Sequence, residues 1–263
     1  VELETEPQDE GYEDIEMVKE VKNYVSGWGY LKHDGSLGEG GFELVTHPMT
    51  LENHIEKFTP ELFRTIRNSN YVSHTNGNCG LHIHISRTAF KSDLAIVKLL
   101  EFIYGNYDSV VSKLGRRSNI TNYCRENVIS SCPLSIYKVF KINDTDRYHA
   151  VNTRNRETIE LRFFRGTLIR DTFVSSLQFA GVLVNLANNI EDMDKKIEWS
   201  DVFLEVYRLG YEELSKEIEK RLDVVSLVEE EYEGYKLEEA KEEEEEEERE
   251  DEIASHLSLE PVE

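Results

Sequence analysis

The chain has 263 residues, of which 39% are apolar, so it can bury a core as one large domain or two small ones. Its formal charge of −23 is uneven, because residues 223–263 alone hold 19 acidic and 3 basic side chains. The mildly acidic remainder has no basic patch interleaved with aromatic residues, which argues against nucleic-acid binding. It also has no run of about 18 apolar residues, so we predict no membrane span or membrane partner.

Cysteine usage predicts the compartment. Cys79, Cys124 and Cys132 are odd in number and form no CxxC pair, which favours a reducing compartment, so we expect a cytoplasmic protein. The N-terminus carries no basic and apolar signal segment. The chain starts at Val1 without a methionine and directly on a strand-like stretch. We therefore expect the natural protein to extend upstream, although a trimmed chain would look the same.

The first 70 residues predict short strands separated by turns and helices. Residues 1–5 alternate at the strand period, which puts Glu2 and Glu4 on one face. Residues 17–25 predict a short helix, and Asp34-Gly35 is a hairpin-type turn signal that leads into a strand over 42–46. Thr59-Pro60-Glu61 combines a cap, a first-turn proline and a first-turn acid, so it begins a helix that runs to about residue 68.

The segment Asn76–Ser86, NGNCGLHIHIS, is the most informative stretch of the chain. Its turn-forming start leads into a strand on which His82 and His84 share one face, while the leucine and isoleucines take the other. Two imidazoles on the same face of a strand favour a metal or phosphate site. The spacing is short and common, so two ordinary histidines on a half-exposed strand remain an equal alternative. Cys79 is expected to be a small buried thiol rather than a nucleophile.

The second half predicts a sheet and its covering helices. Ser92 caps an amphipathic helix that Gly115 ends, and this helix is expected to cover one face of the sheet. The loop 116–135 contains Arg116, Arg117 and Arg125, each of which we expect to face solvent rather than a polyanion. The remaining elements follow from apolar pattern and capping residues: strands at 136–142, 148–152 and 158–164, a buried helix at 171–188, and helices at 200–209 and 211–222.

The last 41 residues predict a separate, acidic tail. Residues 241–252 are almost pure glutamate, so like charges repel at every helical neighbour position and little apolar area offsets the entropy of ordering. We predict a domain over 1–222 and a tail over 223–263 that is disordered or a fraying helix. A solvated tail is favoured over a decoy for basic partners.

Four strand-like pieces share one character, since each places glutamate, histidine or arginine on a single face. They are VELET at the N-terminus, FELVTHP from Phe42, GLHIHIS from Gly80 and IELRFF from Ile159. A set of carboxylates with one imidazole suits Mg²⁺ or Mn²⁺, hard ions that prefer oxygen. A cation that offsets several half-buried carboxylates together also lowers the cost of their desolvation.

These pieces, in this order, resemble the amidoligases, which are carboxylate–amine ligases with a glutamine synthetase-like fold related to glutamate–cysteine ligases. The NGNCGLHIHIS segment is also similar to the NGSGxHxHxS segment of glutamine synthetases. The resemblance runs over most of residues 1–190. It is carried by six motifs: Glu2-x-Glu4, Asp34-Gly35-Ser36, ELVTHP over 43–48, NGNCGLHIHIS over 76–86, RYHAVN over 147–152 and TIELRFFRGT over 158–167.

The resemblance implies a fold and a role for each matching residue. The fold would be α+β, a curved antiparallel sheet with a carboxylate-lined face and helices packed on the other side. Glu4 and Glu43 would hold the metal nearer the carboxylate substrate, with Asp34 preferred over Glu39 as a further ligand. Glu2, His82 and Glu160 would hold the metal nearer the nucleotide phosphates. Arg162, and less surely Arg147, would lie against the transferred phosphoryl group, while His84 either faces the nucleotide or lies behind His82.

The implied activity joins a small-molecule or peptide carboxylate to an amine in the domain over 1–222. ATP phosphorylates the carboxylate, and the amine then displaces phosphate from the acyl phosphate. The loop 116–135 is a candidate lid, because an acyl phosphate must be kept from water. A barrel amidohydrolase is excluded because fewer than about 180 residues follow Ile85. A metal-dependent hydrolase that uses the same site, and a silent scaffold with an acidic interaction tail, remain alternatives, and oligomeric state stays open.

Overall fold

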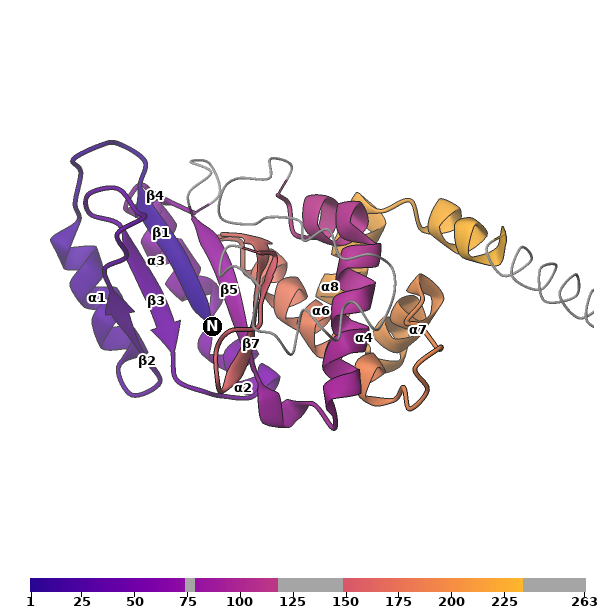
Figure 1. Ribbon diagram of the computed structural model, residues 1–263. Helices are drawn as coiled ribbons and strands as arrows, with labels where there is room; N and C mark the ends of the chain where they lie inside the picture. Colours follow the sequence, from indigo (N-terminus) through magenta and orange to yellow (C-terminus); the bar gives the residue numbers. More distant parts are fainter. Residues whose placement is uncertain (74–78, 118–148, 234–263) are drawn as a thin grey trace, which may run out of the picture.

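The computed structural model describes residues 1–73, 79–117 and 149–233. They form one antiparallel sheet with helices packed against it, which confirms the α+β class (Figure 1). The more specific likeness to the glutamine synthetase fold stays a prediction. The strand expected at 136–142, most of the candidate lid, Cys124, Cys132 and the glutamate-rich stretch lie outside the described residues.

The sheet is built around its first strand. The strands are β1 (Glu2–Pro7), β2 (Gly29–Lys32), β3 (Phe42–Thr46), β4 (Tyr71–Val72), β5 (Gly80–Ser86), β6 (Val151–Asn152) and β7 (Thr158–Arg165). They lie in the order β2-β3-β1-β5-β7-β6, and β4 pairs with the far end of β1. Strand β1 therefore lies between two strands whose sequences carry the candidate ligands.

The two faces of the sheet differ in chemistry, as the alternation in the sequence predicts. Leu3, Leu44 and Leu81 project from the central strands into the main apolar core, and all three are fully buried. Their neighbours along each strand, which include Glu2, Glu43 and His82, project to the other face. The apolar face packs on helices, so the polar face is the one available to a ligand.

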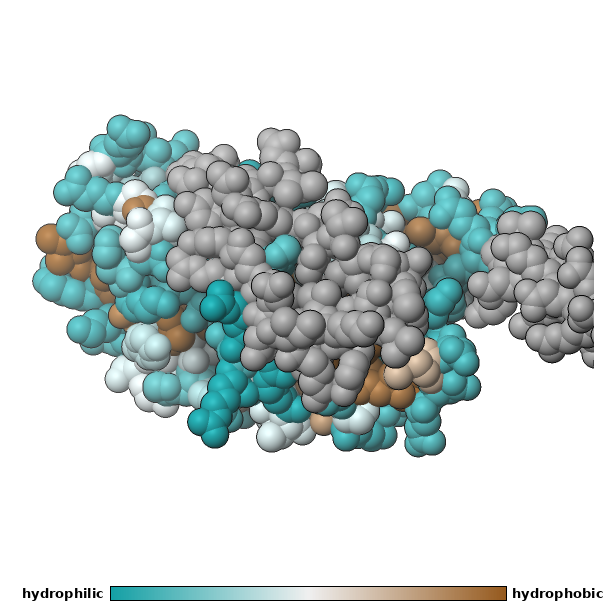
Figure 2. Space-filling view, in the orientation of Figure 1, coloured by the Kyte–Doolittle hydropathy of each residue, from teal (hydrophilic) through white to brown (hydrophobic). Residues whose placement is uncertain are grey.

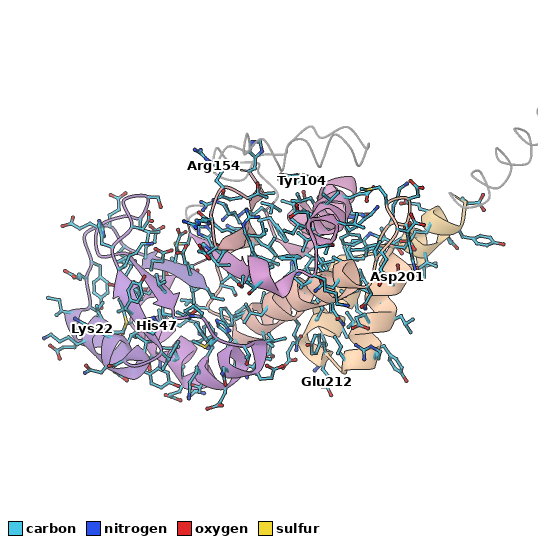
Figure 3. All side chains as sticks on the ribbon, turned by 60° about the horizontal axis from the view of Figure 1, so that its bottom comes forward. Lys22, His47, Tyr104, Arg154, Asp201 and Glu212 are labelled. Carbon is cyan, nitrogen blue, oxygen red and sulfur yellow. The ribbon has the colours of Figure 1, made fainter. Side chains whose placement is uncertain are left out.

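The helices form two groups at opposite ends of the sheet. In Figure 1, α1 (Ile15–Val25) and α3 (Pro60–Asn68) lie behind the end made by β2, β3 and β1. Beyond β7 lie α4 (Asp93–Gly105), α6 (Arg170–Asn188), α7 (Trp199–Leu209) and α8 (Glu212–Arg221). Figure 3 shows the same separation from below, with Lys22 of α1 at one end and Asp201 and Glu212 at the other. The long α6 joins the groups, because α2 (Leu51–Lys57) also packs on it.

Capping residues set the beginnings of several helices. The hydroxyls of Thr59 and Ser92 accept hydrogen bonds from the backbone of Leu62 and Ala95, as the cap pattern predicts. Thr50 caps α2 in the same way. The sequence did not predict α2, which has only seven residues and begins three residues after Pro48.

The helix predicted from Ser92 to Gly115 is divided in the structure. α4 ends at Gly105, and a π-helical segment covers Asp108–Leu114. Its burial also differs from the predicted single apolar side, because Ile96, Leu99 and Phe102 are buried as well. The helix packs on α6, which accounts for burial on more than one side.

The described chain ends in a short helix over 224–233. Its Glu231 accepts hydrogen bonds from the backbone of Trp199 and Ser200 at the start of α7, which attaches this helix to the domain. The predicted boundary between 222 and 223 stays a prediction.

No helix among the described residues is long and apolar enough to cross a membrane. The surface seen in Figure 2 is mostly hydrophilic where it is described, with apolar residues in small separate groups.

Candidate active site

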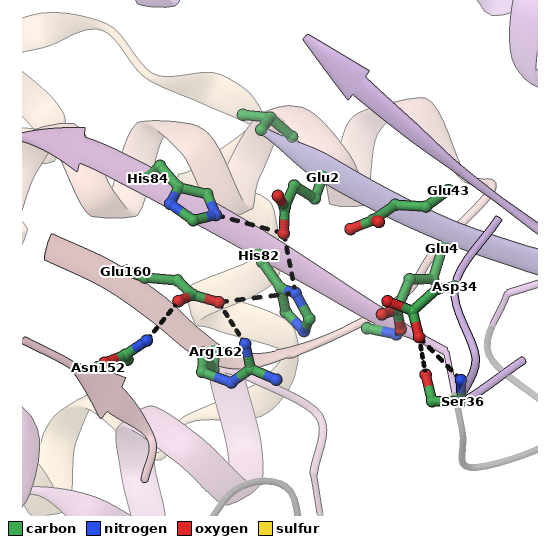
Figure 4. Close-up of polar contacts among 12 residues, drawn as sticks. Glu2, Glu4, Asp34, Ser36, Glu43, His82, His84, Asn152, Glu160 and Arg162 are labelled. Atoms are coloured by element: carbon green, nitrogen blue, oxygen red, sulfur yellow. Dashed lines mark hydrogen bonds and ion pairs between the residues drawn. The ribbon is translucent and has the colours of Figure 1, made fainter. Parts of the chain in front are cut away.

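Strand register brings the predicted ligands to one place on the polar face. Glu2 lies opposite His82 across the β1–β5 pair, and Glu4 lies opposite Glu43 across the β1–β3 pair. Across β5–β7, His84 lies opposite Glu160. Side chains opposite each other in an antiparallel pair are close neighbours. The three pairings therefore gather five predicted metal ligands, together with His84, around β1 and β5 (Figure 4).

The first group of ligands consists of Glu2, His82 and Glu160. One ligand atom from each lies within 4.8 Å of the others. The Nδ1 atom of His82 is 3.4 Å from Glu2 Oε2 and 3.8 Å from Glu160 Oε1. His84 completes this end, because its Nε2 atom is 3.3 Å from the same Glu2 oxygen. Burial acts to raise the pKa of Glu2, but the hydrogen bonds from His82 and His84 outweigh it and hold that pKa well below its usual value.

The second group consists of Glu4, Glu43 and His82, again with ligand atoms within 4.8 Å of one another. Both glutamates are buried. Glu4 accepts a hydrogen bond of 2.5 Å from the backbone N–H of Gly80, yet burial still raises its pKa. Burial likewise raises the pKa of Glu43 to about 8, against the opposing effect of Lys32. His82 is thus shared by both groups.

Two further charged residues border the second group. Asp34 accepts hydrogen bonds from the hydroxyl and backbone N–H of Ser36, which lower its pKa, and its charge acts on both Glu4 and His82. It lies outside both compact groups, so its place as a ligand stays a prediction. Lys32, which sequence reasoning did not single out, reaches Glu43 Oε2 at 2.5 Å and Glu2 Oε1 at 3.9 Å. Its pairing with Glu43 across β2–β3 depends on register, which the sequence pattern does not give.

Glu160 is held from several sides. Its Oε1 atom pairs with Arg162, two residues along the same strand face. Its Oε2 atom accepts hydrogen bonds from Asn152 at 2.7 Å and from Asn155 at 3.3 Å. The sequence predicted Arg162 beside Glu160, but it did not find the two asparagines, which reach Glu160 from β6 and the turn after it.

A β-bulge separates the end of β7 from this site. The register shifts between Leu81 and Ile83, so that Leu81 lies opposite Phe164 and Ile83 opposite Leu161. One extra residue on β7 therefore opposes His82, and Phe163 and Phe164 both enter the core with ring centroids 4.3 Å apart. A bulge re-aims the side chains beside it. Arg162 lies at this irregularity, next to His82 and Glu160.

Arg117 corrects a prediction made from the sequence. We expected it to face solvent, but it is buried and donates a hydrogen bond to the carbonyl of Phe164. Its charge opposes the effect of burial on the pKa of Glu4, and a side chain at Gly80 would meet its guanidinium. Arg116 also turns inward and donates to the carbonyl of Arg165. The chain turns back after Gly115 because Arg116 takes a left-handed conformation with φ of 63°.

The remaining predicted residues have different outcomes. Arg147 and Arg125 lie outside the described residues. Cys79 is buried, and burial raises the pKa of its thiol, which fits the predicted inert thiol. His84 lies beside Glu2 and 3.3 Å from the hydroxyl of Thr158, at the edge of the first group. Whether it contacts a nucleotide stays a prediction.

The chemistry of the donors fits a divalent cation. The Oε2 atom of Glu43 is buried, and its contact with the Lys32 ammonium at 2.5 Å has the distance of an ion pair without the geometry of a hydrogen bond. Each group offers two carboxylates and one imidazole within bonding reach of a single ion. Oxygen-rich sets of this kind suit Mg²⁺ and Mn²⁺ better than zinc, which favours cysteine or several histidines.

Comparison with known proteins agrees with the sequence motifs. Residues 5–130 match the profile of a family described as "putative amidoligase enzyme". The match covers just under half of the chain, and over this stretch it confirms the predicted resemblance to the amidoligases. Among curated proteins, none matches this chain. The matched stretch contains Glu43 and His82, whereas Glu2, Glu4 and Glu160 lie outside it and are brought alongside by β1 and β7.

Proposed function

We propose that this protein is an ATP-dependent carboxylate–amine ligase that works through an acyl phosphate. The observation that carries the proposal is the pair of ligand groups that share His82 on one sheet face, with Arg162 beside them. Phosphoryl transfer needs little covalent help from a protein, but it needs cations around the transferred group. This face has the residues to hold such cations, and its sequence matches an amidoligase family.

Glu2, His82 and Glu160 would hold one Mg²⁺ or Mn²⁺, and Glu4, Glu43 and His82 would hold a second. Such ions would neutralise negative charge on the transferred phosphoryl group. Arg162 contributes a fixed guanidinium, because its pairing with Glu160 orients it toward the same space. Asn152 fixes the other oxygen of Glu160 and so keeps this carboxylate in place.

The proposed reaction balances in two steps. An oxygen of the substrate carboxylate attacks the γ-phosphorus of ATP, the bond to the β-phosphate oxygen breaks, and ADP leaves. The amine nitrogen then attacks the acyl carbon, the carbon–oxygen bond to phosphate breaks, and phosphate leaves as the nitrogen loses a proton. By the resemblance to amidoligases, buried Glu4 and Glu43 would lie nearer the carboxylate substrate, so an ion held there would also reduce repulsion between substrate and protein.

The test is an ADP-release screen over amino acids, polyamines and cell-wall peptides, with mass spectrometry of the products. We expect ADP release that depends on Mg²⁺ and on both an acid and an amine, together with a product whose mass shows loss of one water. Glu160→Ala should abolish this release, because the first group loses a ligand and Arg162 loses its partner. The matched control is Glu157→Ala, whose side chain is 85% exposed near the start of the same strand and which should keep wild-type turnover.

Three outcomes would redirect the assignment. Turnover of an amide or ester without ATP would favour a metal-dependent hydrolase that uses the same carboxylates. Retained ADP release in a folded Glu160→Ala protein, checked by circular dichroism, would show that the proposed site does not carry the reaction. If the protein bound neither Mn²⁺ nor ATP, a catalytically silent scaffold would be the remaining interpretation.

A further inference from the structure

The ammonium of Lys32 lies between two carboxylates, one from each ligand group. Its Nζ atom lies 2.5 Å from Glu43 of one group and 3.9 Å from Glu2 of the other. Lys32 lies on β2, the edge strand, directly opposite Glu43. A positive charge thus already lies among oxygens that would have to coordinate a cation.

The burial of the two partners is unequal. The side chain of Glu43 is 1% exposed, whereas that of Lys32 is 41% exposed. A lysine of this kind keeps its stem on the protein and its ammonium near water, so it can leave the carboxylate without a large desolvation penalty. Glu43 cannot follow it, because its strand lies between β2 and β1 in the sheet.

The ammonium is also an imperfect partner for Glu43. The contact has the distance of an ion pair, but Glu43 Oε2 makes no hydrogen bond among the described residues. Arg162, by contrast, donates a hydrogen bond to Glu160. A divalent ion would coordinate a glutamate oxygen at about 2.0–2.1 Å, and two cations sharing one oxygen at such distances repel strongly.

We propose that Lys32 is a built-in competitor for divalent cations: its ammonium neutralises Glu43 and Glu2 in the cation-free protein and is displaced when a cation binds there. This inference rests on the proposed function, since it assumes that these carboxylates hold cations. In the cation-free protein, the Lys32 ammonium offsets the repulsion between the carboxylates of Glu2 on β1 and Glu43 on β3. It also weakens cation binding at the end of the site next to the carboxylate substrate.

Mn²⁺ binding to the cation-free full chain tests the proposal without any turnover. Free Mn²⁺ is followed by electron paramagnetic resonance in the absence of nucleotide, at one fixed pH for all variants. Lys32→Met removes the charge and keeps the length, and we expect it to bind Mn²⁺ roughly tenfold more tightly. Lys32→Arg keeps a competing charge and should bind no more tightly than wild type.

Lys19→Met is the matched control for loss of one positive charge. Lys19 pairs with Glu16 on α1, away from the site, and its side chain is 63% exposed. We expect its Mn²⁺ affinity to stay at the wild-type value. An equal gain in Lys19→Met and Lys32→Met would overturn the proposal, because the gain would then reflect overall charge.

The remaining outcomes separate this inference from the proposed function. Unchanged or weaker binding by Lys32→Met, with clear binding by wild type, overturns the role of Lys32 and leaves the metal site supported. Absence of Mn²⁺ binding in both proteins overturns both. As a second readout, lysine side chains labelled by ¹³C-methylation should show one resonance that moves when Mg²⁺ is added and that is missing in Lys32→Arg; a resonance that stays in place contradicts displacement.

Discussion

The two ends of the polar face stabilise their carboxylates in different ways. At the β5–β7 end, Glu160 accepts hydrogen bonds on both oxygens from Arg162, Asn152 and Asn155. At the β1–β3 end, Glu43 has an ion pair with a half-exposed lysine. Glu4 accepts one backbone hydrogen bond there, from Gly80. The carboxylate at the β5–β7 end is therefore fixed by hydrogen bonds within the protein, whereas those at the β1–β3 end have fewer partners for their negative charge.

The pKa shifts follow the same division. Burial raises the pKa of both Glu4 and Glu43, which means that the protein at this end does not fully support their charged forms. Glu2 lies between the two ends, and its two histidine partners lower its pKa in spite of burial. The difference teaches that the β5–β7 end is organised in advance by hydrogen bonds, whereas the β1–β3 end keeps buried carboxylates whose charge the proposed cation would neutralise.

Gly80→Ala should have the largest effect, because it acts on both ends together. A Cβ atom at this position would lie 2.7 Å from His82 Nε2 and 2.8 Å from the guanidinium of Arg117. His82 belongs to both ligand groups, so its displacement weakens both. We expect unfolding free energy to fall by roughly 1–3 kcal/mol. Mn²⁺ binding and ADP release should each fall at least about tenfold, which is a loss of about 1.4 kcal/mol in each.

Gly181→Ala is the control for this substitution. Gly181 lies inside α6, and its added Cβ would only touch Leu51 at an ordinary 3.7 Å. Alanine in a helix interior is favoured over glycine by roughly 0.5–1 kcal/mol, so this variant should be slightly more stable and bind Mn²⁺ as wild type does. A Gly80→Ala protein with wild-type Mn²⁺ affinity would show that His82 is not shared by the two groups.

Glutamine substitutions at Glu160 and Glu43 should shift stability in opposite directions in the cation-free protein. Glu160→Gln leaves the partly buried Arg162 without its charged partner and should lower unfolding free energy by about 2 kcal/mol. Glu43→Gln removes a poorly satisfied buried charge. Above a pH of about 8, where Glu43 is ionised, it should raise unfolding free energy by about 1 kcal/mol.

Urea denaturation with and without Mg²⁺ measures both effects. Mg²⁺ should stabilise wild type and give less stabilisation to either variant, since each has lost a ligand. Loss of stability in cation-free Glu43→Gln equal to that in Glu160→Gln would contradict the comparison, because both carboxylates would then be satisfied by the protein alone.

The sequence predicted which side chains share a face but not which of them are neighbours. Alternation at the strand period placed Glu2 with Glu4 and Glu160 with Arg162, and the structure has both pairs on the polar face. The period does not give the register between paired strands, even where the two strands are close in the chain. The meeting of Lys32 with Glu43 therefore could not be predicted, and the same holds for Asn152 with Glu160, eight residues apart.

Arg117 shows a different limit of sequence reasoning. A basic residue after a helix-ending glycine is most often solvated, which led to the wrong expectation for this side chain. Its burial depends on the left-handed turn at Arg116 and on the bulged end of β7, whose Phe164 carbonyl accepts its hydrogen bond. This hydrogen bond joins residues 47 apart in the chain, so local pattern carries no signal of it. The roles of the ligands stay predictions until cation and nucleotide binding are measured.

The smallest expected effect concerns two carboxylates outside the site, Glu198 and Glu231, which serve as a comparison for the buried carboxylates of the polar face. Burial and the nearby Glu231 raise the pKa of Glu198 to about 7, at the start of α7. The unfolded value is about 4.5, so between these values the folded state holds more protons than the unfolded state. Stability from this group is therefore present below pH 4.5 and is lost as pH rises toward 7. Because the side chain is partly exposed, we expect a loss of only about 1 kcal/mol.

Glu198→Gln should remove this part of the pH dependence, and urea denaturation across the window measures it. Glu56→Gln, at a side chain that is 68% exposed on α2, controls for the change in charge and should keep the wild-type slope. Mg²⁺ should leave the difference between wild type and Glu198→Gln unchanged, because Glu231 attaches the helix over 224–233 to α7 far from the polar face. If Mg²⁺ altered that difference, carboxylate crowding alone would attract the cation, and the raised pKa of Glu43 would no longer distinguish the β1–β3 end as a metal site.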